Sequence, residues 1–250
     1  MQITPIQTRK LQPPQDDLLA VLKESIKTLS EKSVVAVSSK VVALWQGRCI
    51  KIDESNRRAQ KEALIKEEAD RYLEKDPAFL HSRLFTIYEG VFTSSAGIDE
   101  SNGNGYFVLL PKDAAAAAAA IRAFLIERYA VTELGVVIVD SRTMPMRNGV
   151  VGVSLGHAGF KALYDYRETE DIFGRKLKFE RLNVADALAT AATLALGEGS
   201  ECTPLALCAD IPHCVFLEED SEDALLTPKV PLEHDVFAQF LAPHPWKQKS

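Results

Sequence analysis

The 250-residue sequence lacks the motifs that identify the commonest nucleotide-binding and hydrolytic sites. It has no phosphate-binding G-x-x-x-x-G-K-[ST] loop and no G-x-G-x-x-G that opens a helix after a strand. It also has no G-x-S-x-G nucleophile elbow. These absences exclude P-loop, dinucleotide-binding and α/β-hydrolase sites of the usual kind. A nucleotide, if the protein binds one, has to be held by another design.

Cysteines are few and are poorly spaced for a metal site. The four of them contain no C-x-x-C pair. A zinc site built from Cys202, Cys208 and Cys214 with His213 is therefore disfavoured. Reduced, partly buried thiols are the better interpretation of all four, Cys49 included.

Long apolar runs and an excess of basic charge are also absent. The longest apolar stretch, 114–121, is mostly alanine and is far too short to cross a bilayer. The first residues show no charged region followed by an apolar run, so we expect no secretory signal, no membrane partner and a cytoplasmic location. The net charge of −6 argues against nucleic acid as a partner.

The remaining composition is that of a globular protein. Hydrophobic residues make up 46% and charged residues 26%, which suits one large domain or two intimate lobes. Strand and helix patterns mix without strict βαβ alternation, so the predicted class is α+β. We expect a single unit over 1–217, with its two lobes divided near 85 and 180. An acidic, proline-bearing and loosely held extension would follow over 218–250.

Hydrophobic periodicity and capping residues place the elements. Helices are expected at 16–29, 57–75, 113–129 and 183–196. Strands are expected at 33–37, 85–93, 106–110, 134–139, 150–155, 177–182 and 204–208. A second apolar segment, 41–45, follows the first strand and is treated as extended. Seven consecutive alanines from Ala114 predict a helix that packs closely against another element.

Three carboxylates stand out by their position. Asp99 lies in a loop between two apolar strands, Asp140 ends the most hydrophobic strand, and Glu198 follows a helix C-terminus. Such oxygen ligands suit Mg²⁺ or Mn²⁺ when phosphate oxygens complete the shell. Taken singly, each also fits an ordinary role as a turn residue, a strand-end residue or a solvated loop charge.

Basic residues gather in the stretch that follows Asp140. They are Arg142, Arg147, Lys161, Arg167, Arg175, Lys176 and Lys178. Arginine pairs with carboxylate or phosphate in a bidentate manner, which suits a polyanionic ligand. Surface charges that balance nearby acids are the simpler interpretation, and the pattern alone favours it.

Specific strings change these odds, because they resemble the coenzyme F-420 γ-glutamyl ligases. Residues 96–102 (A-G-I-D-E-S-N) are similar to that family's A-G-[IV]-D-x-S-N motif, and 139–149 resembles its D-[ST]-x-G-R-P-x-R-x-G segment. The matches run in order from about Val34 to Pro204. The strings S-R-T-M-P-M-R-N-G (141–149) and L-G-E-G-S-E-C-T-P (196–204) are most similar to a branch assigned to folate metabolism.

The resemblance implies a two-lobed α+β fold, an intertwined homodimer, two divalent metals (Mg²⁺ or Mn²⁺) per site and GTP as energy source. A monovalent cation such as K⁺ is a further candidate. The implied metal ligands are Asp99, Asp140, Ser141 and Glu198. The implied nucleotide-contacting residues are Ser39, Lys40, Asn102, Gly197, Glu198, Gly199 and, less securely, Arg9, Lys10, Leu11 and Gln12.

The reaction implied is amide formation between L-glutamate and an anionic acceptor carboxylate through an acyl phosphate. Asp99 and Asp140 would carry the catalysis, and Arg147, seven residues past Asp140, would bind acceptor or glutamate. Since all of these ligands are anions and the chain is acidic, metals and basic side chains must offset the repulsion.

Two departures from the family pattern leave alternatives open. A nucleotide-contacting lysine of the family is Leu44 here, four residues after Lys40, and an arginine near the metals is Met144. One alternative is the same chemistry on a folate-like or other pterin acceptor. Another is a non-catalytic nucleotide-binding dimer, which the intact Asp99, Asp140 and Glu198 disfavour.

Overall fold

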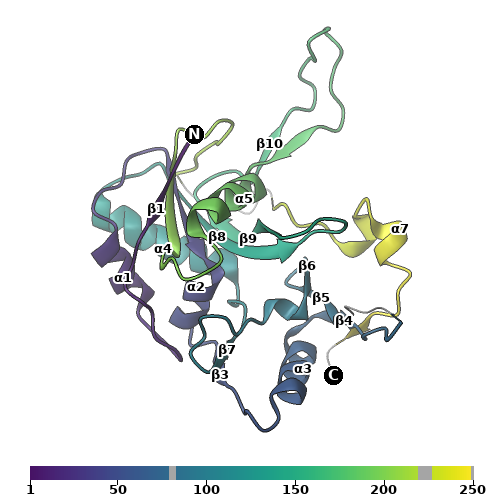
Figure 1. Cartoon of the computed structure of the whole chain (residues 1–250). Helices are drawn as coiled ribbons and strands as arrows, with labels where there is room; N and C mark the ends of the chain where they lie inside the picture. The colour runs from purple at the N-terminus through teal and green to yellow at the C-terminus, as the bar shows by residue number, and fades with distance from the viewer. Residues whose placement is uncertain (79–82, 219–226, 249–250) are drawn as a thin grey trace.

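A five-stranded mixed sheet forms the centre of the fold (Figure 1). The computed structural model describes residues 1–78, 83–218 and 227–248. The strand order is β1-β12-β2-β8-β9. The bounds are Gln2–Ile6 for β1, Ser33–Ser38 for β2, Leu134–Thr143 for β8, Val150–Ala158 for β9 and Leu205–Ala209 for β12.

The two central strands, β2 and β8, run parallel, and every other neighbouring pair in this sheet is antiparallel. Both are nearly continuous apolar runs, as expected for strands covered on both faces. Ser38, the last residue of β2, pairs with Val139, and β8 continues beyond this point to Thr143. The predicted α+β class is confirmed, with helices and mainly antiparallel strands mixed.

Helices cover both faces of the sheet. The helices on one face are α1 (Leu18–Ser25), α2 (Ser39–Trp45) and α4 (Ala114–Tyr129). On the other face lies α5 (Val184–Leu196). The strands alternate accordingly: Val35 and Val37 join the first core, whereas Val34 and Ala36 join the second.

The alanine run is explained by close packing, as predicted. Ala114, Ala117 and Ala118 are buried, and a Cβ added at Gly156 of β9 would lie 2.4 Å from the Ala114 carbonyl carbon. Only a helix of small residues facing glycine can approach a strand this closely. The predicted cap is also confirmed, since Asp113 Oδ1 accepts a hydrogen bond of 2.9 Å from the Ala116 N–H.

A second, smaller group of strands lies below the main sheet in Figure 1. It comprises a four-stranded sheet in the order β13-β4-β5-β6 and the pair β3-β7. The bounds are Cys49–Lys51 (β3), Arg71–Leu73 (β4), Phe85–Tyr88 (β5), Val91–Ser94 (β6), Tyr106–Val108 (β7) and Lys247–Gln248 (β13). The helix α3 (Arg57–Glu68) and the short 3-10 turn η1 (Ser95–Gly97) accompany them.

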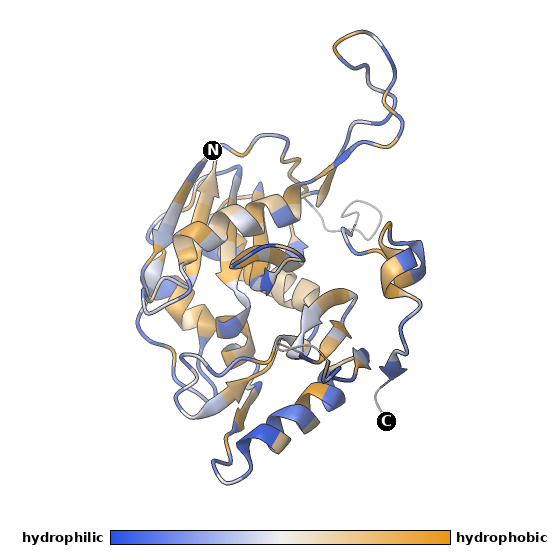
Figure 2. Ribbon diagram, turned by 45° about the vertical axis from the view of Figure 1, so that its right-hand side comes forward, coloured by the Kyte–Doolittle hydropathy of each residue, from blue (hydrophilic) through white to orange (hydrophobic). Residues whose placement is uncertain are grey.

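Two predictions in this region are wrong in detail. The strand expected over 85–93 is two strands, because Glu89 and Gly90 both adopt positive φ and reverse the chain. The helix expected over 57–75 ends at Glu68, and the next residues pair with β5 as β4. The charges of α3 do form a solvated face, and most of this helix is coloured hydrophilic in Figure 2.

The strand expected over 177–182 is also wrong. A long two-stranded arm occupies 163–183, and only its base is a regular ladder, between β10 (Leu163–Asp165) and β11 (Arg181–Asn183). The arm extends away from the rest of the chain in both Figure 1 and Figure 2. Its alternation fails because apolar residues there are exposed rather than directed into a core.

Part of the predicted loose extension is held in place, so that prediction is wrong for its end. It contains η2 (Leu232–His234) and α7 (Ala238–Leu241), and β13 then pairs with β4. The Trp246 ring meets Phe92 edge-on with centroids 6.4 Å apart. Most of the acidic stretch at 218–223 lies outside the described residues. None of the helices formed by the described residues has the length and apolar content to cross a bilayer.

Candidate functional site

A cleft of about 980 Å³ lies where the two strand groups meet. Its walls come from the β2–α2 junction, the end of β8, the loop between η1 and β7, the α5–β12 loop and the N-terminal segment after β1. Predicted site residues that line it are Arg9, Lys10, Leu11, Gln12, Ser39, Lys40, Asp99, Asn102, Asp140, Ser141, Gly197, Glu198 and Gly199. Segments distant in sequence thus converge on one site.

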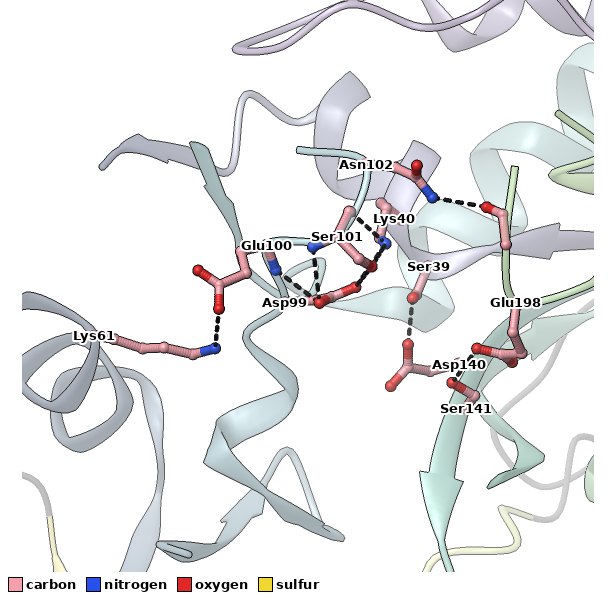
Figure 3. A network of polar contacts seen from close by, with 11 residues as sticks. Ser39, Lys40, Lys61, Asp99, Glu100, Ser101, Asn102, Asp140, Ser141 and Glu198 are labelled. Carbon is pink, nitrogen blue, oxygen red and sulfur yellow. Dashed lines mark hydrogen bonds and ion pairs between the residues drawn. The ribbon is translucent and has the colours of Figure 1, made fainter. Parts of the chain in front are cut away.

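Asp140 meets Ser39, which follows the end of β2. The prediction that Asp140 ends its strand is wrong, because β8 pairs with β9 as far as Thr143. The Ser39 hydroxyl donates a hydrogen bond of 2.6 Å to Asp140 Oδ1 (Figure 3). The parallel register of the two strands causes this contact, because Ser39 and Asp140 directly follow the last paired residues, Ser38 and Val139. Carboxyl ends of parallel strands are the usual location of ligand sites in such sheets.

Burial raises the pKa of Asp140 to about 6, since the charged form loses water contact. The hydrogen bond from Ser39 opposes this rise, and the nearby Asp99 carboxylate adds to it. A pKa this close to neutrality means that the buried surroundings disfavour the charged form of the carboxyl group. A cation bound beside it would remove that penalty.

Lys40 joins the sheet to the opposite wall of the cleft. Its Nζ donates hydrogen bonds to Asp99 Oδ2 at 2.6 Å, to the Ser101 carbonyl at 2.9 Å and to the Ser101 hydroxyl at 3.0 Å. An ammonium group has three N–H donors, so these contacts use all of them. Figure 3 shows the lysine reaching from α2 to the loop that carries Asp99.

The Asp99 carboxylate is held in its charged form. Burial by itself would raise its pKa, but the bonds from Lys40 and Ser101 outweigh burial and lower it to about 2. Oδ1 also accepts hydrogen bonds from the backbone N–H groups of Glu100 and Ser101, at 2.7 and 3.0 Å. The loop is therefore folded around this carboxylate.

The segment that carries Lys40 is a helix, so the extended conformation expected for 41–45 is wrong. Ser38 lacks a side-chain cap bond, yet the helix begins directly after β2 because its apolar face packs on the main core. Residues four apart share one face of a helix. Lys40 and Leu44 therefore lie one turn apart, and both line the cleft.

The α5–β12 loop brings Glu198 to the metal-ligand candidates. Ser141 Oγ donates to Glu198 Oε2 at 3.3 Å, and Asn102 Nδ2 donates to the Gly199 carbonyl at 2.9 Å. Glu201, which the sequence analysis did not single out, organises this loop: its carboxylate accepts from the Gly199 N–H at 2.8 Å. The sequence signal was present, since position 201 is the second glutamate of G-E-G-x-E.

The N-terminal segment at 9–12 is held by a second overlooked residue, Asp16. Its two oxygens pair with Arg9 at 2.7 and 2.8 Å, and Oδ2 also accepts from the Gln12 N–H at 2.8 Å. These contacts hold the pKa of Asp16 well below its usual range. The guanidinium of Arg9 is thus already engaged within its own segment.

Two arginines of the basic cluster lie apart from the cleft. Arg147 is exposed in the turn between β8 and β9 and is not among the lining residues, and Arg175 is exposed on the arm. The substrate-binding role expected for Arg147 stays a prediction that would require movement of this turn. Arg142, on β8 itself, does line the cleft.

The oxygen ligands fit a divalent metal that shares its shell with phosphates. No group of three His, Cys, Asp or Glu side chains among the described residues is close enough to hold a metal alone. Asp99, Asp140, Ser141 and Glu198 nevertheless line one cleft, and Asp140 is a carboxyl that a cation would stabilise. Mg²⁺ commonly binds through one or two carboxylates plus substrate phosphates.

The fold and cleft define a class first: a mixed α/β protein with an oxygen-rich site between its sheets. A family model described as "F420-0:Gamma-glutamyl ligase" matches residues 5–210. The chain therefore belongs to the F420-0:γ-glutamyl ligase family, as the resemblance predicted. The matched range includes every predicted site residue and ends before the C-terminal extension.

Relatives named coenzyme F420:L-glutamate ligase support the ligase class. The chain is 34% identical to the one from Methanopyrus kandleri over 218 residues, which covers 82% of this chain and 84% of the relative. It is 31% identical to that of Methanothermobacter thermautotrophicus, with coverages of 88% and 90%. It is 37% identical to that of Haloarcula marismortui, with coverages of 79% and 82%.

The raised pKa of Asp140 predicts a stability change on neutralisation. An unfolded aspartate ionises near 3.8, below the folded value of about 6, so burying the carboxylate destabilises the fold above pH 6. That penalty disappears as the pH falls towards the unfolded pKa. We expect Asp140→Asn to raise the free energy of unfolding by about 1–3 kcal/mol near neutral pH, and by much less in mild acid.

The measurement is urea unfolding of both proteins with a chelator present, across a pH series. The acid end of the series serves as the internal control, because both side chains are uncharged there. A native protein as stable as the Asn variant at neutral pH, or a difference that does not depend on pH, would contradict the prediction.

Proposed function

We propose that the protein is a GTP- and divalent-metal-dependent γ-glutamyl ligase that joins L-glutamate to the carboxylate of a coenzyme F420-0-type acceptor. The observation that carries this is the convergence of Asp99, Asp140, Ser141 and Glu198 on one cleft. These are the positions at which the chain matches the family's motifs. The names of the relatives supply the substrate class.

The proposed reaction has two steps. The acceptor carboxylate attacks the γ-phosphorus of GTP, an acyl phosphate forms and GDP leaves. The amine of L-glutamate then attacks the acyl carbon, inorganic phosphate leaves and the amine loses a proton. A bound metal would supply charge neutralisation for the phosphates and their alignment. The side chains would supply oxygen ligands from Asp99, Asp140, Ser141 and Glu198.

Lys40 has the position expected of a nucleotide contact. It lies one helical turn before Leu44, where the family carries its lysine, so its side chain can reach the same part of the cleft. Its present bonds hold Asp99 charged, which keeps that carboxylate ready for a metal. In the proposed complex the ammonium would exchange part of this contact for a phosphate oxygen.

The test is incubation of the protein with Mn²⁺, L-glutamate, GTP or ATP, and separate acceptors: F420-0, a folate and a simple hydroxy acid. Mass detection of a glutamyl product with F420-0 and GTP is expected. Product only with the folate would favour the alternative acceptor. No product with any acceptor, despite bound nucleotide, would favour the non-catalytic dimer. Asp140→Asn should abolish turnover and weaken Mn²⁺ binding measured by calorimetry.

Lys40→Ala should raise the dissociation constant of GTP about tenfold, the effect of losing one charge-assisted contact. A fluorescent GTP analogue titrated in the presence of Mn²⁺ measures it. Lys23→Ala removes an exposed lysine of α1 and is the matched control. An unchanged affinity in the Lys40 variant would leave that lysine with a structural role in holding the Asp99 loop.

We also propose that the protein forms a homodimer through the arm at 163–183. Ile172, Phe173 and Phe179 are 91%, 88% and 86% exposed, although the backbone of the arm is ordered by cross-strand hydrogen bonds. Large apolar side chains presented on an ordered projection favour a protein partner, and a second copy of the chain is the partner that the family resemblance implies.

A double variant, Phe173→Asp with Phe179→Asp, should therefore shift the protein from dimer to monomer in sedimentation velocity. Charges buried at an apolar interface without partners oppose association. Val236→Asp alters an equally exposed valine on the C-terminal extension, 82% exposed, and should leave the dimer intact. A monomeric native protein, or a double variant that remains dimeric, would contradict the arm as the interface.

A further inference from the structure

Arg142 lies on the metal-bearing strand, two residues past Asp140. Side chains two apart on a strand point to the same face, so Arg142 shares the face of Asp140 and not that of Ser141, which reaches Glu198. The hairpin register places it opposite Val151. It lines the cleft at the edge beyond the predicted metal ligands.

The charge of Arg142 has no acidic partner within the described part of the chain. Other cations of the cleft do: Arg9 pairs with Asp16, Lys40 with Asp99 and Lys61 with Glu100. The cleft also contains Lys10 and Arg83 without a described ion-pair partner, but both are exposed, whereas Arg142 is partly buried.

One nitrogen of Arg142 is buried without a partner. Its Nε is shielded from solvent and makes no hydrogen bond within the described residues. A buried N–H group that lacks an acceptor is costly, and native structures rarely retain one without a reason. A ligand oxygen in the cleft would satisfy it and would place a negative charge beside the guanidinium.

We propose that Arg142 binds a carboxylate of a substrate, either L-glutamate or the acceptor, through its guanidinium fork. This inference rests on the proposed function and assigns the residue that the anionic substrate meets. Guanidinium geometry matches a carboxylate with two parallel hydrogen bonds. The position also suits the reaction, because a substrate held there lies next to Asp140.

A carboxylate fits this position better than the nucleotide does. Lys40 of α2 follows Ser39, which bonds Asp140, and Asn102 bonds the Gly199 carbonyl, so both predicted nucleotide contacts lie beside the metal-ligand candidates (Figure 3). Arg142 lies two residues beyond Asp140 along β8, where Thr143 and Val150 also line the cleft. It is therefore offset along the strand from the predicted nucleotide contacts.

The test compares Arg142→Ala and Arg142→Lys with Arg128→Ala, which alters an exposed arginine of α4. Initial rates are measured while L-glutamate or F420-0 is varied with the other substrates saturating. Arg142→Ala should raise KM for one of the two carboxylate substrates about tenfold or more, with GTP affinity unchanged within about twofold. Arg142→Lys should not restore KM, because lysine lacks the fork, whereas added methylguanidinium should partly rescue Arg142→Ala.

A rise confined to L-glutamate assigns the carboxylate to the amino acid, and a rise confined to F420-0 assigns it to the acceptor. Unchanged KM for both, a weakened GTP affinity instead, or an equal effect of Arg128→Ala would overturn the inference. Melting midpoints of all variants separate misfolding from lost binding.

Failure of the proposed ligase function can be distinguished from failure of the inference about Arg142. If the native protein turns over no acceptor, calorimetry with L-glutamate in the presence of GDP and Mn²⁺ still compares native protein and Arg142→Ala. Glutamate binding that the variant loses supports the inference in the absence of ligation. F420-0 is titrated in the same way. Equal binding of both ligands by the two proteins, or binding of neither ligand to the native protein, overturns the inference.

Discussion

The parallel pairing of β2 with β8 places Ser39 and Asp140 at one edge of the central sheet, and the cleft is built around that contact. Because β2 ends opposite Val139, the helix that starts after β2 places Lys40 beside Asp140. The α5–β12 loop then adds Glu198 from the neighbouring strand, since β12 pairs with β2 on its other side. Displacement of either central strand would separate all of these groups.

Electrostatic balance in the cleft is achieved locally, in a chain whose net charge is −6. Lys40 neutralises Asp99, and Arg57 and Lys61 neutralise Glu100. Asp140 accepts hydrogen bonds from the Ser39 hydroxyl and the Ser141 backbone, yet burial still raises its pKa, so its charge is poorly compensated. A divalent cation is the partner that best offsets such a group, and it would also reduce repulsion towards phosphates.

Two departures from the family pattern have compensations nearby. Position 44 is Leu44 where the family carries a lysine, and Lys40 lies one helical turn earlier on the same face. The arginine expected at position 144 is absent, but Arg142 lies one two-residue step earlier along the extended chain and lines the cleft.

The sequence by itself determined the family, the α+β class, the buried strands and the candidate carboxylates, because these depend on local pattern and motif. It predicted Asp99, Asp140 and Glu198 as neighbours only through the resemblance. Tertiary structure decided the rest. The helix at 39–45 forms because its apolar face has a core to cover, and Glu89-Gly90 splits a strand by backbone reversal. Arg142 lines the cleft and Arg147 does not, because β8 continues past Asp140 as far as Thr143 and the exposed turn follows it. No local sequence pattern predicts where that strand ends.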